Sequence, residues 1–131
     1  MSRWGTGSFE NNEAQSFILQ LGAKQPEDLK QILERAANKT EYLPADEGSR
    51  VVVVAEIVAA AKGLPSEAAP LEISQWISKI DGVPSAHMND LARRAVNRVR
   101  LHSELKDLWL ESDGLNEWSA VLRDLEQRLT D

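Results

Sequence analysis

The sequence predicts an all-α protein, a compact single-domain bundle of about six or seven helices around a central apolar helix. Three observations support this class. Apolar residues recur at the three- and four-residue spacing of a helix face in one segment after another. Signals that start and stop helices separate these segments. No segment shows the convincing alternation of apolar and polar residues that marks a half-buried strand.

The chain has 131 residues, 42% of them hydrophobic, which fits one globular domain with one core. We expect residues 1–131 to form this domain, with residues 1–10 packed on the bundle as an arm rich in Gly and aromatic side chains. No apolar run approaches the ~20 residues that span a bilayer, and the first residues have no apolar signal core. We therefore expect a cytoplasmic protein with no membrane partner.

The first two helices each present one apolar face. The first should begin at residues 10–13, where Asn11 or Asn12 supplies the N-cap, and end at Gly22. Its apolar positions are Ala14, Phe17, Ile18 and Leu21. The second should begin at Pro26, with acidic residues in its first turn. Its apolar positions are Leu29, Ile32, Leu33, Ala36 and Ala37.

The segment from residue 46 to residue 63 contains four consecutive valines, Val51 to Val54, a composition typical of a buried strand. We predict a helix instead, because the apolar run continues through an Ala-rich stretch to Gly63 and Pro65, a length and a stop signal typical of helices. A strand would also lack a partner. Since it is apolar nearly all round, this helix should be the central one.

Three further segments complete the bundle. A short helix should begin at Pro70 and close at Asp81 and Gly82, with an apolar stripe at Ile73, Trp76, Ile77 and Ile80. A longer helix follows Pro84, and the segment from Ser103 either continues it or restarts with Ser103 as cap. The last helix follows residues 113–114, and its apolar stripe comprises Leu115, Trp118, Val121, Leu122, Leu125 and Leu129.

Composition and spacing exclude several kinds of site. A net charge of −6 opposes binding to nucleic acid, whose phosphates need clustered positive charge. There is no Cys, and His87 and His102 would lie roughly 22 Å apart on one helix, so we expect no metal and no cofactor. No Ser has a local nucleophile signature, and we lean towards a protein that is not an enzyme. The arginines at positions 93, 94, 98 and 100 occupy the polar face of their helix, and we expect that face to be solvated.

Two polar features allow both a functional and a structural interpretation. The run from Trp4 to Gly7 could cradle a phosphate, but Glu10 and Glu13 would repel it, so we favour glycines that let the arm turn while Trp4 and Phe9 fill grooves. Glu56 lies inside the apolar helix and must be paired, hydrogen-bonded or protonated. It is either a proton shuttle or ligand anchor, or, as we favour, the partner of an Arg from residues 93–100 or of a Trp N–H.

Two blocks of the sequence resemble a known family. Residues 4–14 read WGTGSFENNEA, and residues 103–109 read SELKDLW and are followed by Trp118. These blocks, with the acid-containing helix at residues 54–60, resemble the bacterial family called domain of unknown function 4259 over essentially the whole chain. The resemblance supports the fold and assigns no activity. Because both blocks are rich in Trp and small polar residues, we expect Trp4 and Phe9 to pack near Trp109 and residues 103–104.

The candidate binding or motif residues are therefore Trp4, Gly5, Gly7, Phe9, Asn11, Asn12, Glu56, Ser103, Glu104 and Trp109. The leading functional hypothesis is a non-enzymatic protein-binding module, inhibitor- or immunity-like, that binds a basic partner through an exposed patch at Glu111, Asp113 and Glu117.

Two alternatives stay open. One is a small-molecule cleft, either for binding alone or for catalysis, where the two motif blocks meet, lined by Trp4, Asn11, Glu56, Glu104 and Trp109. The other is a structural or oligomer-forming role, which an exposed apolar stripe on the last helix would favour.

Overall fold

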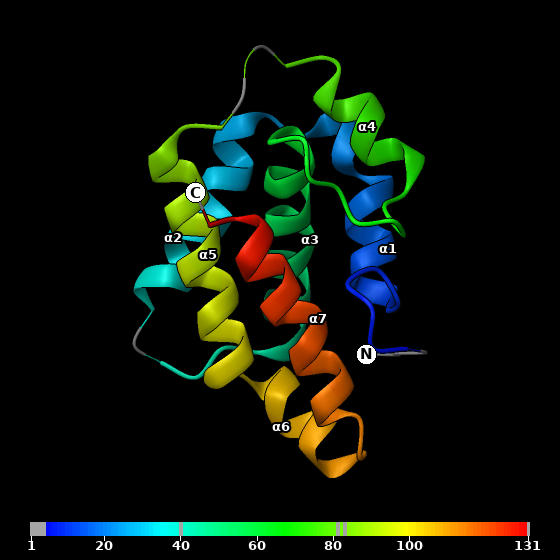
Figure 1. Cartoon of the computed structure of the whole chain (residues 1–131), viewed down its shortest axis with the longest axis vertical. Coiled ribbons are helices and arrows are strands. Elements are labelled where there is room, and N and C mark those ends of the chain that lie inside the picture. The colour runs from blue at the N-terminus through cyan, green and yellow to red at the C-terminus, as the bar shows by residue number, and fades with distance from the viewer. Residues whose placement is uncertain (1–4, 40, 81, 83, 131) are drawn as a thin grey trace.

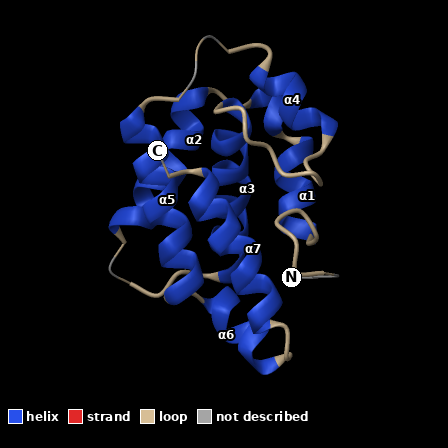
Figure 2. Cartoon of the chain, viewed as in Figure 1, coloured by secondary structure: helices blue, strands red, loops and turns tan. Residues whose placement is uncertain are grey.

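The computed structural model of the chain describes residues 5–39, 41–80, 82 and 84–130, and among them it contains seven α-helices. These are α1 (Asn12–Leu19), α2 (Pro26–Asn38), α3 (Ala45–Ala61), α4 (Leu71–Ile77), α5 (Ala86–Leu101), α6 (Glu104–Glu111) and α7 (Leu115–Arg128). A short 3₁₀ turn, η1 (Leu21–Ala23), follows α1. The predicted all-α class is confirmed (Figures 1 and 2).

Helix α3 is the centre of the bundle and contacts each of the other six α-helices. Its four valines, Val51 to Val54, are all buried. Successive residues of a helix point about 100° apart, so four in a row face different neighbours, and their burial requires helices on every side. The helix prediction is confirmed, because the four valines lie within one continuous α-helix, Ala45–Ala61. Gly63 ends the helix with a φ of 96°, as the Gly–Pro stop predicts.

The other helices surround α3 (Figure 1). Helices α2, α5 and α7 pack on it and on one another in sequence, and α1 and α4 cover the opposite side. Helices α6 and α7 form a hairpin whose connecting turn lies at the lower end of the molecule in Figure 1. None of the described helices has the length and apolar character that crossing a membrane requires.

Side-chain caps fix the helix starts that the sequence left open. Asn11, not Asn12, caps α1, because its Oδ1 accepts a hydrogen bond from the Ala14 backbone N–H at 2.8 Å. The chain restarts between α5 and α6, since His102 leaves the helical conformation and Ser103 caps the new helix. Helix α4 ends at Ile77, earlier than predicted, because the chain tightens into three-residue turns at Lys79 and Ile80. Asp81 lies outside the described residues.

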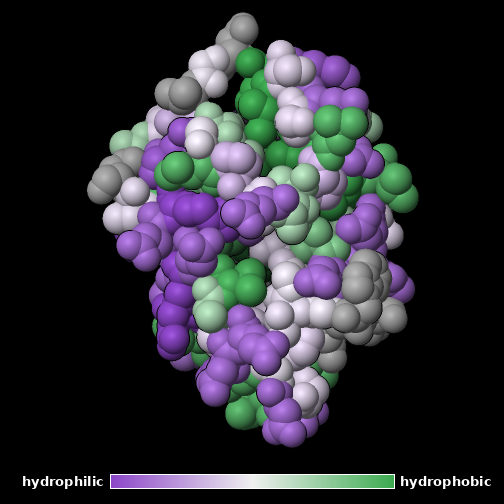
Figure 3. All heavy atoms as spheres, turned by 45° about the vertical axis from the view of Figure 1, so that its right-hand side comes forward, coloured by the Kyte–Doolittle hydropathy of each residue, from purple (hydrophilic) through white to green (hydrophobic). Residues whose placement is uncertain are grey.

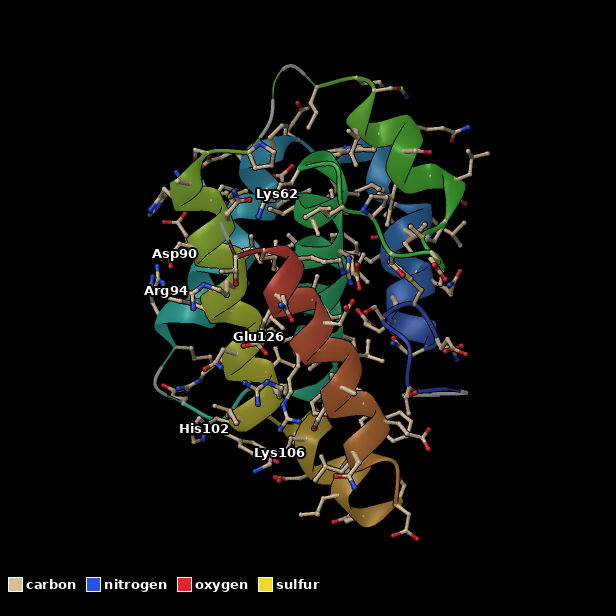
Figure 4. The ribbon with its side chains drawn as sticks, viewed as in Figure 1. Lys62, Asp90, Arg94, His102, Lys106 and Glu126 are labelled. Atoms are coloured by element: carbon tan, nitrogen blue, oxygen red, sulfur yellow. The ribbon has the colours of Figure 1, made fainter. Side chains whose placement is uncertain are left out.

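Two predicted faces differ in their exposure. The stripe of α7 is core, because Trp118, Leu122 and Leu125 are buried, so it is not the exposed apolar stripe that would favour an oligomer-forming role. The arginine face of α5 is solvated only in part. Arg93 and Arg94 bind Asp90 on the outer surface, whereas Arg100 Nε donates to Glu126 Oε2 of α7 at 2.6 Å and ties the two helices together (Figure 4).

Candidate functional site

The glycines of the N-terminal arm close around a carboxylate of the chain itself. Gly7 N–H donates to Glu10 Oε1 at 3.0 Å, and Glu10 N–H donates to the Gly7 carbonyl at 3.2 Å. A Cβ on Gly5 or Gly7 would lie 2.3 or 2.5 Å from a Glu10 carboxylate oxygen, so a larger residue at either position would displace that carboxylate. The anion held by the arm is therefore the side chain of Glu10. Phe9 is buried as predicted, and Trp4 lies outside the described residues.

Glu56 is 2% exposed and fully engaged by two partners. Its Oε2 accepts from Ser8 Oγ at 2.6 Å, and its two oxygens accept from Arg128 Nη1 and Nη2 at 2.9 and 3.2 Å. Pairing with an arginine is confirmed, but the partner predicted from residues 93–100 is wrong. Those arginines lie on the face of α5 that points away from its buried residues. Arg128 is the last residue of α7, one turn after buried Leu125.

Arg128 is held as firmly as its partner. Its Nε donates to Asp124 Oδ2 at 2.9 Å and its Nη1 to the Leu64 carbonyl at 3.1 Å. Burial lowers the pKa of Arg128, but the hydrogen bonds and charges of Glu56 and Asp124 outweigh that effect and hold its pKa above the usual value. Both oxygens of Glu56 are therefore hydrogen-bonded within the fold, which supports the structural interpretation of this residue.

Glu104 of the second motif block forms hydrogen bonds with the start of α3. Ser103 Oγ donates to the Val99 carbonyl at 2.5 Å and accepts from Lys106 N–H. Glu104 N–H donates to the Leu43 carbonyl at 2.9 Å, and Glu104 Oε1 accepts from Ala45 N–H at 2.7 Å. Glu104 thus caps α3 from another helix, close to the positive end of the α3 dipole. Sequence reasoning missed this role because the two residues are 59 positions apart.

Replacing Glu104 with Ala should lower the free energy of unfolding by about 1–2 kcal/mol, because Ala45 N–H loses its cap. Thermal or urea denaturation followed by circular dichroism measures this change. Glu111→Ala on the same helix is the control, and its effect should stay within about 0.5 kcal/mol because Glu111 is exposed. Equal losses in the two variants would contradict the capping role.

The two motif blocks meet, but not as a cleft. Gly5 to Ser8 and Asn11 lie around a space of about 20 Å³ whose other side is formed by Leu105, Trp109 and Trp118. Such a space holds about one water molecule. Glu56 faces a different, open hollow of about 890 Å³ between the arm, residues 65–70 and α7, and Glu104 lies at the start of α3. Of the residues expected to line one cleft, Asn11 and Trp109 share this small space, whereas Glu56 and Glu104 lie elsewhere. Phe9 lines the open hollow that Glu56 faces.

A concentration of negative charge lies at the α6–α7 hairpin. Residues 104–117 contain five acidic residues and one lysine, a net charge of −4 within a chain of −6. We call Glu111, Asp113 and Glu117 the acidic tip. All three are exposed, and none forms an ion pair with another residue of the described part of the chain.

The backbone of the acidic tip is fixed by two features of its turn. Asp113 adopts a φ of 64°, a conformation that Asn and Asp tolerate better than most residues. A Cβ on Gly114 would lie 2.4 Å from the Trp109 ring, so the glycine lets the turn close over half-buried Trp109. Leu110, beside Trp109, is 58% exposed. The tip therefore presents charge and apolar surface together, as the lower end of the molecule shows in Figure 3.

Tyr42 lies close to the acidic residues of α6. Its hydroxyl donates a hydrogen bond to Asp107 Oδ2. That hydrogen bond, followed by desolvation and by the negative charges of Asp107, Glu104 and Glu111, raises the pKa of Tyr42 to about 12. The folded state holds this proton more tightly than the unfolded state, so the contribution to stability is present below about pH 10 and is lost as the pH rises through 12.

The chain contains one tyrosine, so this shift can be measured directly. Absorbance at the phenolate band should titrate with a midpoint near 12 in the native protein. In Asp107→Asn the midpoint should fall towards the ordinary value of about 10. Circular dichroism at each pH tests whether the protein is still folded. A midpoint near the ordinary value in the native protein would exclude the hydrogen bond to Asp107.

Comparison with known families identifies the chain. A family model described as domain of unknown function (DUF4259) matches residues 2–121. The chain belongs to this family. No curated protein and no solved structure matches the chain. The predicted resemblance is confirmed, and in this DUF4259 member the matched residues include the arm, Glu56 and the acidic tip. Arg128, which holds Glu56, lies beyond the match.

Among the described residues, no three metal-ligating side chains lie together. The polar motif residues Asn11, Ser103 and Glu104 are engaged in helix caps. Asn11, Glu56, Ser103 and Glu104 thus form contacts within the fold, whereas the side chains of the acidic tip are exposed.

Proposed function

We propose that the protein is a non-enzymatic binding module that recognises a basic surface of a partner protein through the acidic tip. The observation that carries the proposal is that Glu111, Asp113 and Glu117 are exposed and have no ion-pair partner among the described residues. Exposed charges of one sign steer an oppositely charged partner to the surface on which they lie.

Several acidic residues elsewhere are neutralised by ion pairs. Arg50 binds Glu13 at 2.5 Å, and Lys39 binds Glu47 at 3.2 Å. Asp90 is paired with two arginines, which lower the pKa of its carboxyl, Arg93 before Arg94. These pairs cancel charge locally, whereas in residues 104–117 one lysine accompanies five acids.

Exposed apolar side chains lie beside these charges, and this favours a docking surface for a partner protein over a hairpin that is only solvated. Leu110 and Tyr42 are 58% and 57% exposed, and both lie on or against α6. Charges at the rim of an interface set the rate and specificity of association, whereas buried aromatic and aliphatic side chains supply most of the binding energy. This combination fits an inhibitor- or immunity-like module, an analogy of chemistry and not of descent.

The experiment is capture of partners from the native lysate by the tagged protein at low salt, followed by binding measurements with the purified partner. The tip variant carries Glu111→Lys and Glu117→Lys. Asp113 is left unchanged, because Lys would be strained at its positive φ. The control variant carries Glu67→Lys and Glu72→Lys, which change the net charge equally at exposed positions away from the hairpin.

We expect a basic partner that binds one-to-one and whose affinity falls at least about tenfold in the tip variant and with added salt. The control variant should bind as the native protein does. Absence of a partner, or equal weakening by both variants, would overturn the proposal.

A further inference from the structure

We propose that the hollow beneath α4 is a binding site for a small amphipathic carboxylate with an aliphatic tail. The hollow has a volume of about 410 Å³ and lies between the start of α2, the last turns of α3, and α4 with the segment that follows it. It is at the end of the molecule opposite the acidic tip, so it is independent of the function proposed above (Figure 1).

The walls of the hollow are mainly apolar. They are formed by Leu29 of α2, Ile57 and Ala61 of α3, Trp76 of α4, and Ile80 and Met88 beyond it. Figure 3 shows hydrophobic residues open to solvent in a recess near the top of the molecule, beside α4. Ligand pockets of roughly 300–1,000 Å³ take small molecules, and an apolar wall selects an aliphatic or aromatic body.

Two residues from different helices shape the hollow. Ala61, the last residue of α3, adds only a methyl group to the lining, and Trp76 of the short helix α4 forms one wall. The Trp76 ring is held in place, since its Nε1–H donates to the Lys24 carbonyl at 3.1 Å. One wall is therefore rigid before any ligand binds, which lowers the conformational entropy lost on binding.

A cationic side chain at the edge of the hollow favours a ligand with a negatively charged head group. Lys79 contributes to the lining and is exposed, so its ammonium group lies where an apolar wall meets solvent. No ion pair joins it to another residue of the described ranges. An aliphatic tail in the hollow with its carboxylate at Lys79 would satisfy both features.

Isothermal titration calorimetry with decanoate tests the site. The native protein should bind one decanoate per chain with a dissociation constant below about 1 mM. Ala61→Phe places a ring in the hollow and should weaken binding at least about tenfold. The matched control is Ala60→Phe on the neighbouring residue, which faces a different hollow of about 400 Å³ and should leave binding unchanged.

The charge of the head is tested separately. Lys79→Gln should weaken binding of decanoate about two- to fivefold, because an exposed ion pair is weak. The control Lys30→Gln, at a position outside the lining of the hollow, should leave decanoate binding unchanged. Decan-1-ol should bind the native protein more weakly than decanoate by a similar factor.

No binding by the native protein at about 1 mM decanoate would overturn the proposal, as would loss of binding in Ala60→Phe but not in Ala61→Phe. If Ala61→Phe does not fold, NMR of the native protein decides. Decanoate must shift the Trp76 indole N–H and Met88 methyl signals. Shifts confined to other residues would overturn the site.

Discussion

Replacing Arg128 with Met should lower the free energy of unfolding by about 3–5 kcal/mol, because Glu56 then stays buried without its counter-charge. Ser8 Oγ would remain as a partner, but one hydroxyl does not compensate a carboxylate in an apolar core. Native domains are stable by only about 5–15 kcal/mol, so the variant loses a large share of the total. Urea denaturation followed by circular dichroism measures the change.

The control for Arg128→Met is Arg123→Met, which removes an exposed arginine from the same helix and should change stability by no more than about 0.5 kcal/mol. Replacing both partners, Glu56→Met with Arg128→Met, should recover part of the loss, because no uncompensated charge remains. Similar losses in the two single variants would show that the pair does not matter to the fold.

Replacing Leu125 with Ala should lower the free energy of unfolding by about 2–5 kcal/mol. Leu125 is completely buried where α7 packs on α3 and α5, and removing its side chain leaves a cavity that rigid helices cannot close. The same change at Leu19, which is 79% exposed, should have an effect within about 0.5 kcal/mol. A small loss at Leu125 would mean that α7 is not part of the core. Thermal denaturation of both variants measures the difference.

The sequence predicted the helices well because their signals are local. A Pro or a capping residue starts most helices, a glycine ends α3, and the apolar spacing identifies the buried face. Val51 to Val54 could be assigned only by weighing length and flanking residues against their β-branched composition. Burial on every side by other helices is a property of the whole bundle, so no local pattern could prove it.

The partners of the polar residues could not be predicted, because they are contacts between distant parts of the chain. Glu56 clearly needed a partner, but several arginines were available, and only the docking of α7 selects Arg128, 72 positions away. The same holds for Glu104 and the start of α3. The motif blocks were found correctly as features of the sequence, yet a motif does not show whether its residues face a ligand or the rest of the fold.

The contacts of Glu56 also bear on the order in which the chain can fold as it is synthesised. Its carboxylate belongs to a helix in the first half of the sequence, but its arginine comes at residue 128. Until Arg128 has been synthesised, Glu56, which is buried in the finished fold, lacks its counter-charge. Lys62 likewise lacks the carbonyl groups of Arg128 and Thr130 to which it donates. Contacts so distant in sequence form late and slow folding. We therefore expect the bundle to complete its core only after synthesis of α7, with the earlier helices held in a looser state until then.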